Sequence, residues 1–461
     1  MENKMVRIVR HLCMAGLIYF IPTPALTQSM TPSDSLLQQR LEEIDQKERI
    51  LERKWELAQE DATAKSKQTA VAAAGKDGFN LKSADGNFQL KLRGYIQSDA
   101  RFFGADDQDS YPNTFLMRRI RPIFEGTLDK HFDFYLMMDF GGGSATVQDA
   151  YIDFHYVPQM RLRFGKMKGP IGIERLQSGA NLLFMERSLP TNLVPNRDLG
   201  IQLHGELAQG AITYAVGLFN GVVDGASADT DVEDGKDIMA RLFLLPFKNN
   251  DGWLQNFGFG LARSSGIQNG TVSAPALTSY KTPAQLTAFR YRSDGTAAGT
   301  VIANGKRTRM SPQAYFYNGP FGILAEYVIS EQVVKLDAAN RKLGNSSWQV
   351  AASYMLTGQK LTFKGAALSN SFNPKENSWG AFELAARLSN LSVDENSFPL
   401  FADNAKSIQE INSIGVGINW YLNKNIKFSL NYEQSTFDRG AAKEADRVQE
   451  KVISSRLQLS Y

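Results

Sequence analysis

The chain has 461 residues, a formal net charge of +3 and 43% hydrophobic residues. This near-neutral balance excludes a strongly basic nucleic-acid-binding protein, and we expect no nucleic-acid partner. Cys13 is the only cysteine. The chain beyond it therefore has no disulfide and no cysteine metal ligand, and we expect no metal or other cofactor.

Residues 1–27 have the layout of a secretory signal peptide. Lys4, Arg7 and Arg10 precede an apolar run over residues 12–21, and small residues follow as far as Thr27. The apolar run is shorter than the roughly 20 residues that a membrane-spanning helix needs. We therefore expect export and cleavage near Thr27, which would also remove Cys13.

Residues 33–61 predict a short coiled-coil helix of about three heptads. Apolar residues follow alternating three- and four-residue steps, with Glu48 interrupting the seam: Leu37, Leu41, Ile44, Leu51, Trp55 and Ala58. The alternative is an amphipathic helix that lies on the protein's own surface. Residues 62–86 are rich in Ala and Lys, lack a periodic apolar face and indicate a linker.

Residues 87–461 alternate between apolar and polar positions in short runs. In one such run, over residues 132–140, Phe132 and Phe134 alternate with Asp133 and Tyr135. This period of two is typical of β-strands with one apolar face. A soluble sandwich would turn that face inward, whereas a transmembrane barrel turns it towards lipid.

The strand count and the connection lengths favour the barrel. About sixteen strands can be counted, and an even number is expected of single-chain bacterial barrels. Short joints interleave with long connections at residues 104–114, 168–199, 220–235, 266–305, 333–345, 392–407 and 438–450. Two joints break this pattern, a short one at 141–144 and a long one at 358–378. We predict an all-β antiparallel transmembrane barrel in the outer membrane of a Gram-negative-type bacterium, surrounded by lipid.

Basic residues dominate the face that a barrel turns towards its lumen. The inward set is Lys91, Arg93, Arg101, Arg119, Arg121, Arg161, Arg163, Arg241, Arg307, Arg309, Arg387 and Arg456. Guanidinium groups stay charged and match oxyanions, so this wall indicates an anion-preferring channel. The alternative is that acids such as Asp99, Glu125 and Asp139 balance the arginines across the lumen.

The connection at residues 168–199 is too apolar for a solvated surface loop. If it folds into the barrel, Leu182, Leu183 and Phe184 would pack against the wall. It would then form a constriction, with basic side chains near the narrowest point: Lys166, Lys168, Arg175 and Arg187. The alternative is packing over an outer rim or against a neighbouring subunit.

Several motifs together resemble the phosphate-selective porins O and P. They are LRGY at 92–95, FLMRR at 115–119, QDAY at 148–151, FGKMK at 164–168, ERL at 174–176 and FMER at 184–187. The resemblance implies a homotrimeric sixteen-stranded barrel whose arginines lead oxyanions to a constriction that carries a lysine. Arg118 and Arg119 match the family's paired arginines, and Lys166 is assigned to the lysine position. The connection at 168–199 departs from the family because it lacks an arginine cluster beyond Arg175 and Arg187.

The sequence therefore predicts a porin that passes inorganic phosphate or other small anions by passive diffusion. A general porin, or one for sugars or polyanions, is the nearest alternative, although the inward Tyr95, Tyr135 and Tyr151 are scattered along the sequence. A structural barrel that displays surface loops is a second alternative. An enzyme is not expected, because no nucleophile motif accompanies the histidines, which are His11, His131, His155 and His204.

Overall fold

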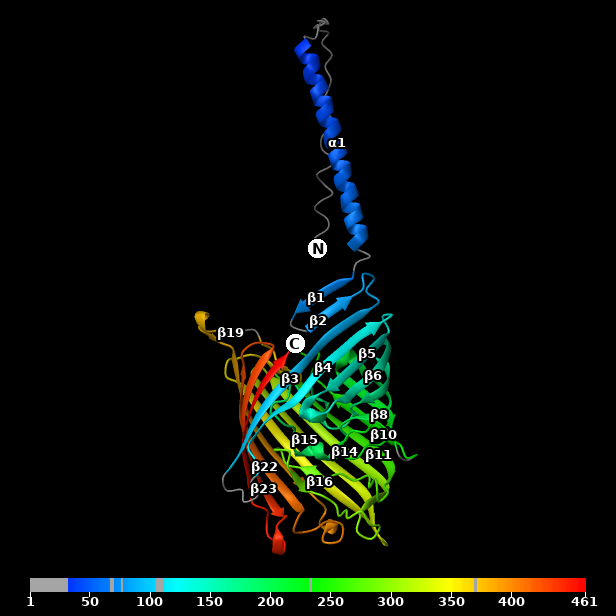
Figure 1. Cartoon of the computed structure of the whole chain (residues 1–461), viewed down its shortest axis with the longest axis vertical. Helices are drawn as coiled ribbons and strands as arrows, with labels where there is room; N and C mark the ends of the chain where they lie inside the picture. The colour runs from blue at the N-terminus through cyan, green and yellow to red at the C-terminus, as the bar shows by residue number, and fades with distance from the viewer. Residues whose placement is uncertain (1–31, 67–69, 76–77, 105–110, 232–233, 369–370) are drawn as a thin grey trace. The chain divides into compact units, whose positions relative to one another are not determined.

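A computed structural model describes residues 32–66, 70–75, 78–104, 111–231, 234–368 and 371–461. The predicted signal peptide at 1–27 lies outside the described residues. The chain forms two compact units, Met1–Lys67 and Gln68–Tyr461. The first contains helix α1 and the second contains the strands (Figure 1).

Helix α1 (Pro32–Ser66) forms the described part of the first unit. It continues five residues beyond the predicted end at residue 61. Its predicted seam is open to solvent, since Leu41 is 59% and Leu51 66% exposed. Among the described residues, no helix combines the length and the apolar character needed to cross a bilayer. The coiled coil stays a prediction.

Sixteen antiparallel strands close into a barrel in the part of the chain that the structure describes. They are β3 (Gln89–Phe103), β4 (Thr114–Leu128), β5 (Phe132–Asp139), β6 (Thr146–Val157), β7 (Met160–Met167), β8 (Asp198–Leu207), β9 (Ile212–Phe219), β10 (Asp237–Leu244), β11 (Phe257–Asn269), β14 (Ile302–Asn318), β15 (Phe321–Leu336), β16 (Ala339–Met355), β21 (Ala381–Ser392), β22 (Ile408–Tyr421), β23 (Ile426–Arg439) and β24 (Glu450–Ser460). Each pairs with its neighbour in sequence, and β24 pairs with β3 to close the sheet. The predicted fold class is confirmed.

The burial pattern of this barrel is the inverse of that of a soluble sandwich. Apolar residues on one face of the strands are exposed, as in Ile152 at 55% and Ile414 at 58%. Polar residues on the other face are buried, and Arg456 is only 2% exposed. An apolar exterior around a polar interior is expected when the surrounding solvent is lipid.

Two sequence predictions about connections are wrong. The predicted linker at 62–86 contains a hairpin, β1 (Val71–Gly75) and β2 (Gly78–Lys82). β2 pairs with residues 89–92 of β3, and β24 pairs with residues 95–103 of the same strand. The connection at 333–345 is a tight turn between β15 and β16, because both strands continue to Leu336 and Ala339. β1 contains only Val, Ala and Gly, and the run at 337–342 has two alanines and four polar residues, so neither shows the apolar–polar alternation of a half-buried strand.

Short elements lie in the connections that remain. They are η1 (Gly141–Gly143), α2 (Ile173–Leu176), η2 (Leu189–Leu193), η3 (Ala208–Gly210), β12 (Tyr280–Lys281), β13 (Thr287–Phe289), β17 (Leu361–Thr362), β18 (Gly365–Ala366), β19 (Phe372–Asn373), η4 (Pro374–Glu376), β20 (Ser378–Trp379), η5 (Glu395–Ser397) and η6 (Ala442–Glu444). The connection between β11 and β14 packs Phe289 and Tyr291 into an apolar cluster with Phe401. That cluster includes inward residues of the wall, such as Ile411 of β22 and Phe437 of β23. This connection therefore packs against the inner face of the barrel wall.

We expect helix α1 to be dispensable for barrel closure, because the two units are separately compact. A chain that lacks residues 32–66 should still give a heat-modifiable band on SDS gels of the outer-membrane fraction. A chain that lacks residues 450–461 should not, because β24 supplies the pairing that closes the sheet. Loss of the heat-modifiable band in the first variant would show that the helix is needed for assembly.

Candidate functional site

The connection between β7 and β8, residues 168–197, crosses the interior of the barrel. The Gln97 amide of β3 donates a 3.0 Å hydrogen bond to the Gly179 carbonyl. On another part of the wall, Asn419 of β22 donates to the Leu183 carbonyl at 2.9 Å. The Ile173 N–H, at the start of α2, donates to Glu326 of β15. Contacts with β3, β15 and β22 place this connection, named here the lumen loop, across the channel.

One carboxylate anchors the lumen loop to the wall. Glu186 is 5% exposed and accepts a 2.6 Å hydrogen bond from Nε of Arg118. Arg101, Arg119 and Arg456 each approach its oxygens at 3.1 Å. Burial alone would raise the pKa of Glu186, but the guanidiniums of Arg118, Arg119 and Arg456 hold that pKa well below its usual range. The group is therefore a buried anion.

Carboxylates also engage most of the other arginines that the sequence assigns to the anion pathway. Arg121 binds Asp139 at 2.8 Å, and Arg309 binds both Asp224 and Asp237. The same holds for the pairs Arg93–Glu125, Arg161–Asp133, Arg163–Asp153, Arg307–Asp237 and Lys166–Asp229. Arg175 and Arg187 instead bind carbonyl groups of the lumen loop itself. At these sites the structure has the arrangement in which acids balance arginines.

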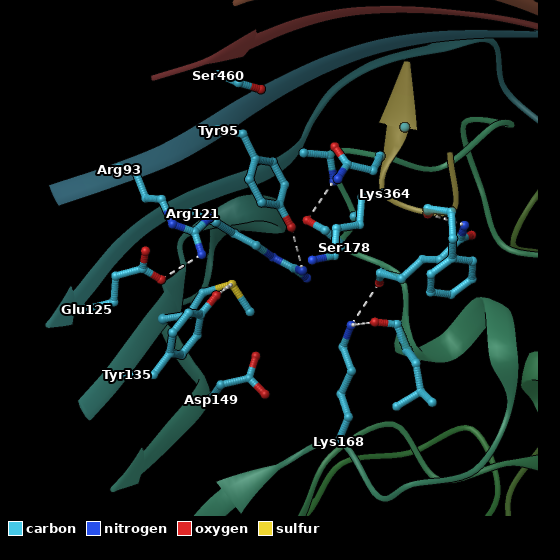
Figure 2. A pocket seen from close by; sticks show the side chains of 18 of the residues that line it. Arg93, Tyr95, Arg121, Glu125, Tyr135, Asp149, Lys168, Ser178, Lys364 and Ser460 are labelled. Atoms are coloured by element: carbon cyan, nitrogen blue, oxygen red, sulfur yellow. Dashed lines mark hydrogen bonds and ion pairs between the residues drawn. The ribbon is translucent and has the colours of Figure 1, made fainter. Parts of the chain in front are cut away.

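A cavity of about 1190 Å³ lies between the lumen loop and the end of the barrel that carries the short turns. Figure 2 shows Arg93, Arg121 and Lys168 on its sides, with Lys364 nearby. Eleven basic side chains line it: Lys91, Arg93, Arg121, Arg161, Arg163, Lys168, Arg197, Arg241, Lys364, Lys424 and Lys427. The acidic side chains of the lining are Glu125, Asp149 and Glu206. Cations outnumber anions on this surface.

Six of these cations form no ion pair among the described residues: Lys91, Lys168, Arg241, Lys364, Lys424 and Lys427. Lys168 donates to the carbonyl groups of Leu176 and Gln177, at 3.3 and 2.8 Å. Burial, and then the charges of Arg187 and Arg197, hold the pKa of Lys168 well below its usual range. An anion beside this ammonium group would offset the repulsion from Arg187 and Arg197.

The structure also brings together side chains that the sequence separates. Tyr135 of β5 and Tyr151 of β6 are neighbours in register, and their rings stack at 5.2 Å with an interplanar angle of 6°. Arg163 lies over the Tyr151 ring at 4.2 Å. The expectation that the inward tyrosines are scattered is therefore wrong for this pair, because strand pairing sets the distance.

Sequence reasoning missed several cations of the cavity. Lys427 lies on the polar face of β23, and the same alternation that identified Arg456 could have found it. Lys364 lies in the connection between β16 and β21, where no strand pattern orients side chains. The unexpected length of that connection was the only sign in the sequence that it could contribute to the lumen. The connection folds back into the barrel, since Phe363 stacks on Tyr315 at 5.1 Å.

We expect the Glu186→Gln variant to be less stable. Removing one partner from a buried charge network costs about 3–5 kcal/mol, because the remaining charges stay buried. The temperature at which the folded band converts to the unfolded band on SDS gels should therefore fall. Glu376→Gln, at an exposed position of η4, is the matched control and should convert at the wild-type temperature. Equal conversion temperatures for all three proteins would contradict an anchoring role.

Comparisons with known proteins agree with this architecture. The model of the family "Phosphate-selective porin O and P" matches residues 88–461. Porin O of Pseudomonas aeruginosa is 23% identical over 387 residues, which cover 79% of this chain and 86% of that protein. The outer membrane channel DcaP of Acinetobacter baumannii has a similar fold, with a TM-score of 0.53, 11% identity and coverage of 84% of this chain and 100% of that one.

An anion-selective porin from Comamonas acidovorans also shares the fold. Its TM-score is 0.52 at 9% identity, with coverage of 81% of this chain and 100% of that one. The family and the fold are those of channels rather than enzymes, and they locate the protein in the outer membrane. A sixteen-stranded barrel, an internal loop and a family match over residues 88–461 lead to one conclusion. The chain is an outer-membrane porin of the phosphate-selective porin O and P family.

Proposed function

We propose that the channel prefers anions and passes phosphate or related oxyanions by passive diffusion. The observation that carries this proposal is the cavity lining, in which six cations lack an ion-pair partner among the described residues. Unbalanced positive charge on the wall of a water-filled channel concentrates anions and repels cations. The description of the family, and that of the relative Porin O, support the same direction.

The lumen loop is the proposed constriction. An anion that passes it must shed water, and the lost hydrogen bonds must be replaced. Lys168 can donate to such an anion. The anion's own charge favours the protonated ammonium form, which has three N–H bonds, and the two hydrogen bonds of Lys168 go to neutral carbonyls. Charge-assisted hydrogen bonds of roughly 1.5–3 kcal/mol offset part of the dehydration and remain weak enough for release.

The arginines at Glu186 have a different role in this proposal. Arg101, Arg118 and Arg119 bind Glu186 of the lumen loop. They therefore affect permeation by fixing where the lumen loop lies in the channel. Their charge is only partly cancelled, because Glu186 and Asp99 face four guanidiniums. They therefore add to the positive potential of the lumen without contacting the permeating ion.

Charge reversal of two exposed cations tests the preference for anions. Lys364 and Lys424 line the cavity and are exposed, so the Lys364→Glu/Lys424→Glu variant should fold. Each charge several ångströms from the ion contributes about 0.5 kcal/mol even in water, so the anion-to-cation permeability ratio should fall at least about threefold. Reversal potentials in planar bilayers at low salt give the ratio, and the effect should shrink at 1 M salt.

Lys375→Glu is the matched control for this experiment. Lys375 is exposed in η4 of the same connection as Lys364, but it does not line the cavity. Its substitution should leave the permeability ratio unchanged. A wild-type ratio near one, which would indicate a general porin, would refute the proposed function. An unchanged ratio in the double variant would show that the cavity does not set selectivity.

We also propose that the protein is a homotrimer joined in part through helix α1. The seam residues Leu37, Leu41 and Ile44 are each about 60% exposed in the single chain. A helix of 35 residues with an exposed apolar seam is stabilised by packing against copies of itself. Native mass measurement of the detergent-solubilised protein should give three chains, and Leu41→Asp/Ile44→Asp should lower that mass or the stability of the assembly. A monomer at micromolar concentration would refute the trimer.

A further inference from the structure

The outer face of four neighbouring strands changes from apolar to polar towards the long-loop end. β11, β14, β15 and β16 lie side by side in the sheet (Figure 1). Leu261 of β11 and Met310 of β14 are exposed on the apolar part of this face. Tyr327 of β15 and Trp348 of β16 are register partners near its edge. Aromatic side chains mark the level at which the apolar band of an outer-membrane barrel meets the lipid headgroups.

Cations occupy outward positions beyond this aromatic pair, one on each of the four strands. They are named here the outer basic patch: Arg263 of β11, Lys306 of β14, Lys335 of β15 and Lys342 of β16. Lys306 points outward with its register partner Ile267, which is 54% exposed. Lys342 shares the face of Trp348, because an even number of residues separates the two.

Little negative charge balances the outer basic patch. Among the described residues, Glu331 is the one acid at the outward positions of these strands beyond the aromatic pair. It forms a 2.7 Å ion pair with Lys342. Arg263, Lys306 and Lys335 form no ion pair within the described part of the chain. Since neighbouring strands are about 4.8 Å apart, the patch presents three uncompensated cations on a surface about 15 Å wide.

The long-loop ends of β3 and β4 differ from this surface. Phe102 and Phe115 lie there, both exposed, and their rings make an edge-to-face contact at 6.1 Å. The positive charge of the outer basic patch is therefore a local feature and not a property of the whole rim.

We propose that the outer basic patch binds the phosphate groups of lipid headgroups in the outer leaflet of the membrane. The long loops of such barrels face the outside, so the patch lies where the apolar band ends and the outer-leaflet headgroups begin. Each cation near an anionic lipid surface adds to the attraction, and a guanidinium can bind two phosphate oxygens at once. A lipid suits this surface better than a protein partner does, because the adjoining apolar part of the same face is already turned towards lipid. The inference is separate from the proposed function, since these side chains point away from the lumen.

Lipid titration followed by native mass spectrometry tests the patch on the detergent-solubilised protein. The titrants are bisphosphorylated lipid A and the same lipid without its phosphates. The variant Arg263→Gln/Lys306→Gln/Lys335→Gln removes three outward charges and keeps the Glu331–Lys342 pair. One cation near an anionic lipid surface changes the affinity about fivefold, so phosphorylated lipid A should bind this variant at least about tenfold more weakly than the wild type. The dephosphorylated lipid should bind both proteins equally.

Lys130→Gln/Lys360→Gln/Lys375→Gln is the matched control, because it removes three exposed charges at the short-turn end. It should bind phosphorylated lipid A as the wild type does, and a heat-modifiable band on SDS gels confirms that each variant is folded. Unchanged binding by the patch variant would overturn the inference, as would equal weakening in both variants, which would assign the effect to net charge. Equal binding of the two lipids by the wild type would overturn it too, because acyl chains alone would then account for binding. Displacement of the lipid by millimolar inorganic phosphate would show that the patch binds the free anion instead.

Discussion

The structure depends on the interaction between Glu186 and the arginines around it. Arg101, Arg118, Arg119 and Arg456 come from β3, β4 and β24, where the barrel closes. Placing a carboxylate among them costs several kcal/mol of desolvation, which the surrounding charges offset. The same contacts hold the lumen loop across the channel. Closure of the barrel and the shape of its interior are therefore linked at one group.

Arginine and lysine have different roles on the inner face of the barrel. Guanidinium groups are planar and weakly hydrated, and they bind two oxygens at once, which suits buried structural pairs. Most inward arginines have that role here, as in Arg121 with Asp139. Ammonium groups are compact, and those of Lys168 and Lys427 contact carbonyls rather than carboxylates. Lysine therefore supplies much of the charge that a passing anion would meet.

The interior is also divided along the barrel axis. At the long-loop end, the connection between β11 and β14 packs Phe289 against Phe398 and Tyr291 in an apolar cluster. At the short-turn end the cavity stays open and basic. Segments from both ends meet at the lumen loop, since Gln177 donates to the carbonyl of Phe363 and Asn192 donates to that of Lys281. The basic cavity and the apolar cluster thus come from different parts of the chain.

The sequence by itself determined the barrel and the face on which most strand side chains lie. Arg118 is an exception, because it is the extra residue of a β-bulge and reaches Glu186 beside the inward Arg119. Once the strand count indicates a barrel with its apolar face towards lipid, a period of two assigns Arg119 and Arg163 to the lumen, because successive side chains of a strand point to opposite faces. It could not reveal their partners. Glu186 reaches Arg119 from 67 residues away, whereas Lys168 meets no carboxylate in the described chain. Only tertiary structure decides which inward cations remain uncompensated, because long connections bring their charges to the wall in ways that no local pattern encodes.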